Sequence, residues 1–203
     1  MKPKDLLLAR LSLISNDIED LGFKFYCSQP KFKRIIGEFE QEISFKLNRY
    51  NCEDDCTFYT IWRVYSKTYT KWFIEKFDEK PLGNTIASSL DWNIPNWTKG
   101  IPDHFNLRNT KSDILEIGLL LQNIQKAGIP YLDSVSNWTG ASKQYISSRL
   151  GFYLAADCLM IAGKKEKAKQ VLFEGLEEYQ KEGRKDGLME VPKINRRIQR
   201  FFS

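Results

Sequence analysis

The first hydrophobic pattern of the chain has helical spacing. Between Leu6 and Leu21 the apolar residues recur every three or four positions and would form one buried stripe. The stripe consists of Leu7, Leu11, Ile14, Ile18 and Leu21. Gly22 follows directly, and glycine is common just after the last turn of a helix. The pattern therefore predicts one amphipathic helix that ends at Gly22.

From Phe23 to Phe77 the period changes to two. Three runs of alternating apolar and polar residues begin at Phe23, Phe39 and Phe58, and a fourth, shorter run spans Lys71–Ile74. Alternation that is rich in aromatic and β-branched residues is typical of strands with one buried face. Turn signals at Ile36-Gly37 and over Asn51–Asp55 separate the runs. Short connections between consecutive strands predict an antiparallel meander whose apolar face is covered by the first helix.

Residues 81–109 have no clear period. They contain three prolines, two glycines and two tryptophans, so this stretch is interpreted as a long irregular segment. Loops of this length in compact domains are often functional.

The rest of the chain has helical character. Helices are predicted over Asp113–Lys126, Lys143–Ala162, Lys164–Lys181 and Pro192–Phe202, with a short helical turn at Tyr131–Ser136. Gly128 is expected to stop the first of these helices, and Pro192 is expected to be the first residue of the last. The segment from Tyr153 to Leu172 is interpreted as a helical hairpin, because its small and apolar residues are similar in spacing to a tetratricopeptide unit.

Together these elements predict an α+β fold. It would have an N-terminal helix, an antiparallel meander of about four strands and a C-terminal bundle of about four helices. No linker rich in Ser, Gly or Pro separates the two halves. Residues 1–203 are therefore predicted to form a single domain, in which 1–109 supply helix, sheet and loop, and 110–203 supply a helical portion packed on them.

Composition adds few constraints on function. The chain is 42% hydrophobic and 28% charged, which is typical of a globular protein. Its net charge of +5 is spread along the chain, whereas nucleic-acid binders usually cluster their basic residues, so nucleic acid is not the predicted partner. The sequence has neither an apolar run of bilayer length nor a signal-peptide pattern, and a cytoplasmic location is expected. The four irregularly spaced cysteines are expected to be free thiols.

No catalytic motif is recognisable. The single histidine, His104, cannot build a histidine-ligated metal site alone, and no Gly-x-Ser-x-Gly elbow accompanies it. Phosphate-binding glycine loops are also missing. The pair Cys52 and Cys56 has three intervening residues and is interpreted as part of a hairpin turn. The sequence therefore predicts no catalytic residue, metal site or cofactor, although a site built from carboxylates alone stays open.

Two groups of residues are candidates for partner binding. Glu38, Glu40 and Glu42 alternate along a predicted strand and would gather negative charge on one face, unless that face is simply solvated. The segment Ser89–His104 combines acidic residues with large aromatic ones, which are frequent interface anchors. Its candidate residues are Asp91, Trp92, Trp97, Asp103 and His104. The alternative is that both tryptophans fold back onto the sheet.

The last predicted helix has a basic face. Arg196, Arg197 and Arg200 are expected opposite Ile194, Ile198 and Phe201, as in helices that meet nucleic acid or a membrane surface. The alternative is a docked terminal helix with a solvated face.

Two short motifs support a family resemblance. The step Leu21-Gly22-Phe23-Lys24 follows the first helix, and Ile129-Pro130-Tyr131-Leu132 follows the first helix after the meander. With this order of elements, residues 6–135 resemble small bacterial α+β proteins of the polymorphic-toxin immunity type. The resemblance implies a protein that binds a cognate toxin and not an enzyme, and it supplies no catalytic residues. The longer helical tail departs from the pattern.

Three functional hypotheses follow. The first is an immunity protein that occludes a cognate toxin, with an acidic patch suited to a basic nuclease toxin. The second is a small-molecule-binding protein or carboxylate-based enzyme with a pocket between sheet and helices. The third is nucleic-acid binding through the C-terminal arginines.

Overall fold

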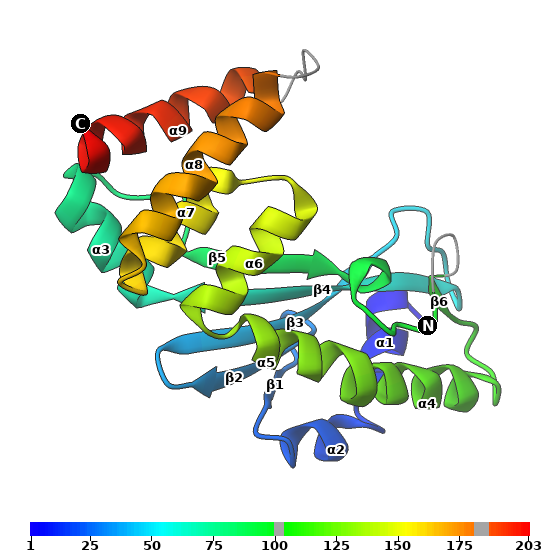
Figure 1. Cartoon of the computed structure of the whole chain (residues 1–203). Helices are drawn as coiled ribbons and strands as arrows, with labels where there is room; N and C mark the ends of the chain where they lie inside the picture. Colours follow the sequence, from blue (N-terminus) through cyan, green and yellow to red (C-terminus); the bar gives the residue numbers. More distant parts are fainter. Residues whose placement is uncertain (100–103, 181–186) are drawn as a thin grey trace. The chain divides into compact units, whose positions relative to one another are not determined.

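The computed structural model describes residues 1–99, 104–180 and 187–203 (Figure 1). These residues group into two compact units. Unit 1 comprises Met1–Tyr65 and Ser88–Asp133, and unit 2 comprises Ser66–Ala87 and Ser134–Ser203. Within the described ranges, no helix combines the length and the apolar character that a membrane crossing requires.

Unit 1 is built around the sheet. Its strands are β1 (Lys24–Tyr26), β2 (Lys31–Ile36), β3 (Phe39–Leu47), β4 (Cys56–Ser66) and β6 (Phe105–Leu107). A further strand, β5 (Thr85–Leu90), begins in unit 2 and ends in unit 1. The described strands have the order β1-β2-β3-β4-β5, and β6 pairs with the start of β4 through Cys56 and Leu107. The β1–β2, β2–β3 and β4–β6 pairs are antiparallel, so the predicted antiparallel arrangement is confirmed for them.

The number of strands was predicted too low. β2 was missed because its alternation of apolar and polar residues is weak. Phe32 is its one fully buried apolar residue, and Ile35 is apolar but exposed. β5 and β6 fall in the segment that was predicted to be irregular. The turn predicted at Ile36-Gly37 is confirmed, since Gly37 has the positive φ of 58° that a tight hairpin requires.

The prediction of a strand at Lys71–Ile74 is wrong. These residues belong to α3 (Lys67–Phe77) in unit 2. The Ser66 hydroxyl caps this helix by accepting a hydrogen bond from the Thr68 N–H, and Tyr69 and Phe73 are buried four residues apart. The short run of three apolar residues was therefore one turn of a helix, which a four-residue window does not distinguish from a strand.

The helices of unit 1 pack on one face of the sheet. They are α1 (Pro3–Leu11), α2 (Ser15–Glu19), α4 (Asp113–Asn123), the π-helical segment η2 (Ile124–Gly128) and α5 (Ile129–Val135), with a 3-10 turn, η1 (Asp91–Asn93). The end of α5, from Ser134, already belongs to unit 2. The prediction of a single helix from Leu6 to Leu21 is wrong, because a turn between α1 and α2 interrupts the helical conformation. The buried stripe is otherwise confirmed, but Leu21 is 37% exposed.

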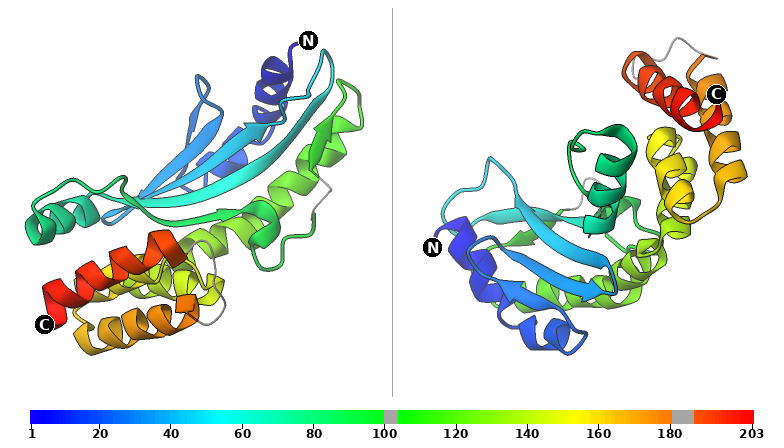
Figure 2. Two further views of the ribbon diagram at one scale, coloured as in Figure 1. Left: turned by 90° about the horizontal axis from the view of Figure 1, so that it is seen from above. Right: turned by 90° about the vertical axis from the view of Figure 1, so that its left-hand side faces the viewer.

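Gly128 does not end a helix, contrary to the prediction. α4, η2 and α5 follow one another without interruption (Figure 1). Pro130 is the second residue of α5 and lies in its first turn. The reason is tertiary: α4 lies along the sheet (Figure 2), and Gly128 sits against the indole ring of Trp62 in β4. The short helix predicted at Tyr131–Ser136 is confirmed as α5.

Unit 2 consists mainly of helices. After α3 they are α6 (Trp138–Ser148), α7 (Phe152–Ile161), α8 (Lys165–Gln180) and α9 (Gly187–Phe202). Phe152, Leu159, Leu172 and Ile194 belong to their shared core, and α7 and α8 form the predicted hairpin. The helix predicted at Lys164–Lys181 is confirmed in its described part.

Two boundaries in unit 2 were predicted wrongly. The helix expected over Lys143–Ala162 is split into α6 and α7, because Arg149 and Gly151 have positive φ angles of 52° and 68°, which end α6 and begin α7. Pro192 lies inside α9 and not at its first position. Packing of Ile194 and its neighbours in the unit 2 core stabilises the helix despite the missing N–H of Pro192.

The α+β class is therefore confirmed, whereas the layout is matched only in part. The grouping of elements does not divide at residue 109, because α4–α5 pack on the sheet in unit 1 and α3 belongs to unit 2. The prediction of a single domain over 1–203 stays a prediction.

Candidate functional site

The two faces of the sheet in unit 1 differ sharply. Along β4 the residues alternate without exception between buried and half-exposed, with Phe58 and Trp62 on the buried side and Tyr59 and Arg63 on the other. The buried face contacts the helices: the Gln41 side chain donates a hydrogen bond to Asp133 of α5 at 3.0 Å. We call the opposite side the open face. Its residues on β1–β4 are Lys24, Tyr26, Lys31, Lys33, Ile35, Glu40, Glu42, Ser44, Lys46, Thr57, Tyr59, Ile61, Arg63 and Tyr65.

Glu42 is the centre of an ionic network on the open face. It is only 6% exposed, and the ammonium groups of Lys31 and Lys33 lie 3.4 and 3.5 Å from its carboxylate. Arg63 of β4 lies at 3.3 Å, and the hydroxyl groups of Ser44 and Tyr65 donate to the same carboxylate at 2.7 and 3.1 Å. Three cations and two hydroxyl groups therefore satisfy one nearly buried carboxylate.

The predicted acidic strand face is thus corrected. Glu40 and Glu42 do share a face, but Lys33 pairs with both of them, and Glu38 lies in the turn before β3. On the open face of β1–β4 five cationic side chains face two carboxylates. The face is therefore basic, because the cations come from neighbouring strands that the pattern of β3 alone does not reveal.

This network makes stability dependent on pH. Burial alone would raise the pKa of Glu42, but the hydrogen bond from Ser44, the charge of Lys31, the bond from Tyr65 and the charge of Lys33 together hold it below its ordinary value of 4.5. The unfolded chain consequently binds more protons in acid than the folded protein does. The stabilisation by Glu42 is complete above pH 4.5 and is lost as the pH falls through the lowered pKa of the folded state.

We therefore expect Glu42→Gln to cost about 2 kcal/mol at neutral pH, the scale of hydrogen bonds to a charged group. The difference from the unaltered protein should shrink as the pH falls below 4.5. Urea unfolding at a series of pH values measures it. A cost that is the same at every pH would contradict the assignment of a lowered pKa.

Three aromatic side chains form a second feature of the open face. The ring of Tyr59 lies 5.3 Å from that of Trp92 and 5.4 Å from that of His104, and the Trp92 and His104 centroids are 5.5 Å apart. All three side chains are half-exposed. We call them the aromatic triad. It brings together two residues of the predicted loop with one residue of β4.

The other predicted loop residues have different positions. Trp97 folds back onto the buried face, where it packs edge-on against Trp62 at 5.7 Å and Phe105 at 6.2 Å. Trp97 therefore matches the alternative in which the tryptophans fold back onto the sheet. Trp92 remains partly accessible, as an interface anchor would. Asp103 lies outside the described residues.

Asp91 is a buried structural residue and not an accessible one. It is 4% exposed and accepts hydrogen bonds from the Thr60 N–H at 2.8 Å and from the Trp92 N–H at 2.9 Å. Burial raises the pKa of this carboxyl group above its ordinary value, although these hydrogen bonds act in the opposite sense. Its role is to fasten η1 to β4 and so to position Trp92.

The basic face predicted for the last helix is only partly present. Arg197 is 3% exposed and forms a buried ion pair with Asp157 of α7. Arg197 was predicted to be solvated, because the sequence of the last helix does not reveal that one of its arginines pairs with a buried carboxylate of another helix. Arg196 pairs with Glu79, and Arg200 is exposed.

Catalytic chemistry finds little support in unit 1. The interface of sheet and helices is filled by side chains such as Trp62, Ile117 and Leu120, each no more than 2% exposed. The carboxylates Glu40 and Glu42 lie on the opposite, open face. Among the described residues, no cluster of His, Cys, Asp and Glu has the geometry to hold a metal ion. The thiol of Cys56 is buried, which raises its pKa to about 12 and makes it a poor nucleophile.

The open-face residues that sequence reasoning missed had a usable signal. Tyr59, Arg63 and Tyr65 occupy the alternate positions of a strand that was predicted correctly, so their common face followed from its period of two. Lys31 and Lys33 could not be placed, because β2 itself was missed.

Comparison with protein-family models, curated proteins and solved structures found no match to this chain.

Proposed function

We propose that the protein is a cytoplasmic immunity protein that binds and neutralises a cognate bacterial toxin by direct occlusion, with the open face as its docking surface. The observation that carries the proposal is the combination of accessible aromatic rings and ordered charges on one face of a sheet whose other face is packed with helices. Aromatic and arginine side chains are the residue types most enriched at binding hot spots.

The open face is suited to binding because its side chains are already fixed. The rings of the aromatic triad restrain one another, and the Glu42 network restrains Lys31, Lys33 and Arg63 in ion pairs. Ordering a long side chain on binding costs about 0.5–1.5 kcal/mol, so a surface that is ordered beforehand avoids this cost.

The charge of the open face favours an acidic partner surface. Lys24 and Lys46 are exposed and have no ion pair among the described residues, so they are available to a partner. Complementary charge speeds association and fixes orientation. This replaces the acidic patch, suited to a basic nuclease toxin, that was expected from the sequence.

The test is binding and neutralisation of the product of the adjacent gene. Counting from the hydrogen bond between the Asn48 N–H and the Thr57 carbonyl, Lys46 of β3 faces Tyr59 of β4. The double variant Lys46→Glu/Tyr59→Ala should weaken the complex by about 100-fold, as expected for loss of a hot-spot ring and reversal of a facing charge. It should also abolish protection of cells that express the toxin.

The turn between β3 and β4 supplies a matched control. Arg49 and Tyr50 are of similar chemistry, since the guanidinium lies 4.6 Å from the ring centroid and Tyr50 is 75% exposed. Arg49→Glu/Tyr50→Ala removes the same kinds of group at positions outside the strands that form the open face, and it should leave the affinity within about threefold. Equal effects of the two double variants, or an adjacent product that is not toxic, would refute the proposal.

A second candidate function uses the same face. Open sheets with basic and aromatic side chains bind single-stranded nucleic acid by stacking bases and pairing phosphates. The aromatic triad with Lys46 nearby is the observation that favours it. Fluorescence anisotropy with a labelled oligothymidine strand separates the candidates. Binding that falls steeply with salt and is lost in Lys46→Glu/Tyr59→Ala would support nucleic acid over a toxin.

A further inference from the structure

Unit 2 contains a largely apolar pocket with several charged residues in its lining, built from other residues than the open face. It has a volume of about 610 Å³, within the range of small-molecule sites. Its walls come from α3, the loop after α3, α7 and α9, all of which belong to unit 2. The side chains used in the argument below are Tyr69, Phe73, Glu79, Lys80, Tyr153, Lys193, Arg196 and Arg197.

We infer that this pocket binds a small organic anion with a flat aromatic body. The inference does not depend on the proposed toxin partner, because the pocket and the open face are built from different units.

Among the charged residues that line the pocket, cations are in the majority. Lys193, Arg196 and Arg197 lie three and four residues apart on α9 and so share one side of that helix. Lys80 adds a fourth cation from the loop, and Glu79 is the acidic residue among those that line the pocket. Asp157 and Glu190 lie behind this lining and pair with Arg197 and Lys193. The residues that line the pocket therefore carry four positive charges and one negative charge.

The Arg196–Glu79 ion pair is the part of the site in which a ligand anion could replace a side chain. Both side chains are nearly half-exposed, 44% and 49%, so their attraction is weakened by water. Arg196 extends from a helix and its guanidinium lies 4.7 Å from the ring centroid of Phe77, whereas Glu79 extends from a loop. A ligand anion can therefore take the place of the Glu79 carboxylate on an arginine that is already oriented.

The floor and walls of the pocket are rigid and aromatic. Arg197 donates two hydrogen bonds to Asp157 and one to the Lys193 carbonyl, and Tyr69 donates to the same carboxylate. The Arg197 guanidinium lies 4.7 Å from the ring of Tyr153. Tyr69 and Phe73 complete the apolar surface, and Leu82 is fully exposed at the pocket. A flat apolar group is the natural complement of such walls.

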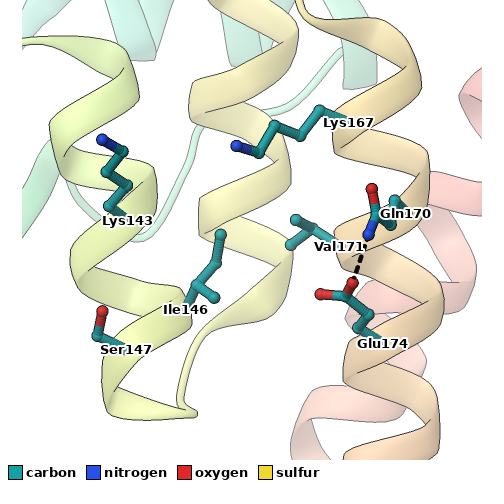
Figure 3. A pocket seen from close by; sticks show the side chains of 7 residues that line it. All are labelled: Lys143, Ile146, Ser147, Lys167, Gln170, Val171 and Glu174. Atoms are coloured by element: carbon teal, nitrogen blue, oxygen red, sulfur yellow. Dashed lines mark hydrogen bonds between the residues drawn. The ribbon is translucent and has the colours of Figure 1, made fainter.

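A second groove in unit 2 provides a control. Figure 3 shows Lys143 of α6 and Lys167 of α8 on the two helices that border it, with Ile146 and Val171 between them. It is smaller, about 300 Å³, and no aromatic residue lines it. Lys143 and Lys167 have no ion pair in the part of the chain that is described. Removing them deletes two positive charges without altering the aromatic pocket.

The probe is anilinonaphthalene sulfonate, an aromatic anion whose fluorescence rises in apolar sites, titrated into the folded full-length chain. We expect saturable binding at one site. Lys193→Ala/Arg196→Ala should weaken it at least about tenfold, whereas Lys143→Ala/Lys167→Ala should change it by less than about twofold. Glu79→Gln should strengthen it, because the competing carboxylate is gone. Far-UV circular dichroism and the unfolding midpoint verify that each variant is folded.

Competition identifies which part of the ligand is recognised. Adenosine monophosphate should displace the probe, and inorganic phosphate at equal ionic strength should not, because phosphate lacks the aromatic body. Equal displacement by both would overturn the aromatic part of the inference. No saturable binding, or equal losses in the two double-alanine variants, would overturn the pocket itself.

Discussion

Gly128→Ala should destabilise the protein by about 3 kcal/mol, at the upper end of overpacking effects. An added Cβ would lie 2.5 Å from both Cζ2 and Cζ3 of the Trp62 indole, and it would clash with Cη2 as well. Real side-chain contacts are not so short, so either the ring or the helix must move.

Neither partner in this contact is free to move. Trp62 is fully buried, its indole N–H donates to the Thr60 hydroxyl at 2.8 Å, and Trp97 packs edge-on against it. Gly128 closes the π-helical segment η2, and such segments reposition one turn of a helix. The expected loss is measured by urea unfolding followed by circular dichroism.

Gly118 supplies the matched control. It lies in α4, a few turns before Gly128, and an added Cβ would meet no atom within 4 Å. Gly118→Ala should therefore stabilise the protein by about 0.5–1 kcal/mol, because alanine is the better helix former. A clash with Trp62 also predicts that Gly128→Ala costs less when Trp62→Phe is already present, by about 1–2 kcal/mol. Equal costs in both backgrounds would contradict this explanation.

Arg197→Ala should cost about 3–5 kcal/mol, the range found when one member of a buried ion pair is removed. The substitution leaves the Asp157 carboxylate, which has no exposed surface, with the Tyr69 hydroxyl at 3.2 Å as its remaining donor among the described residues. It also removes the guanidinium from the rings of Phe77 and Tyr153. The loss should be visible as a lower urea midpoint.

A substitution of the neighbouring Arg196 separates the effect of burial on stability from the effect of charge. Arg196 belongs to the same helix and also forms an ion pair, but an exposed one, so Arg196→Ala should cost less than about 1 kcal/mol. Replacing both buried partners by apolar residues, as in Arg197→Met/Asp157→Leu, should recover most of the stability, because no unpaired charge remains buried. Equal losses of stability in Arg196→Ala and Arg197→Ala would show that the buried Arg197–Asp157 pair contributes no more to stability than the exposed pair.

The sequence by itself determined the class of the fold and the inward residues of its clearest elements. The period of two in β3 and β4 assigned Phe45, Phe58 and Trp62 to a buried face, and each is at most 8% exposed. Helical spacing likewise identified Leu7, Leu11 and Ile18 in the first two helices. These inferences succeeded because period and burial are set by local backbone geometry, which neighbouring residues in the sequence reveal.

Only the tertiary structure decided where helices stop and which charges are paired. Gly128 has the sequence signature of a helix end, yet the helix continues, because the glycine is there to admit the ring of Trp62 from β4. The three glutamates of one segment suggested an acidic surface, yet cations of β2 and β4 neutralise Glu42. Arg197 is buried in an ion pair with Asp157, which is 40 residues away in the sequence. In each case the deciding contact joins residues far apart in the chain, and no local pattern records it.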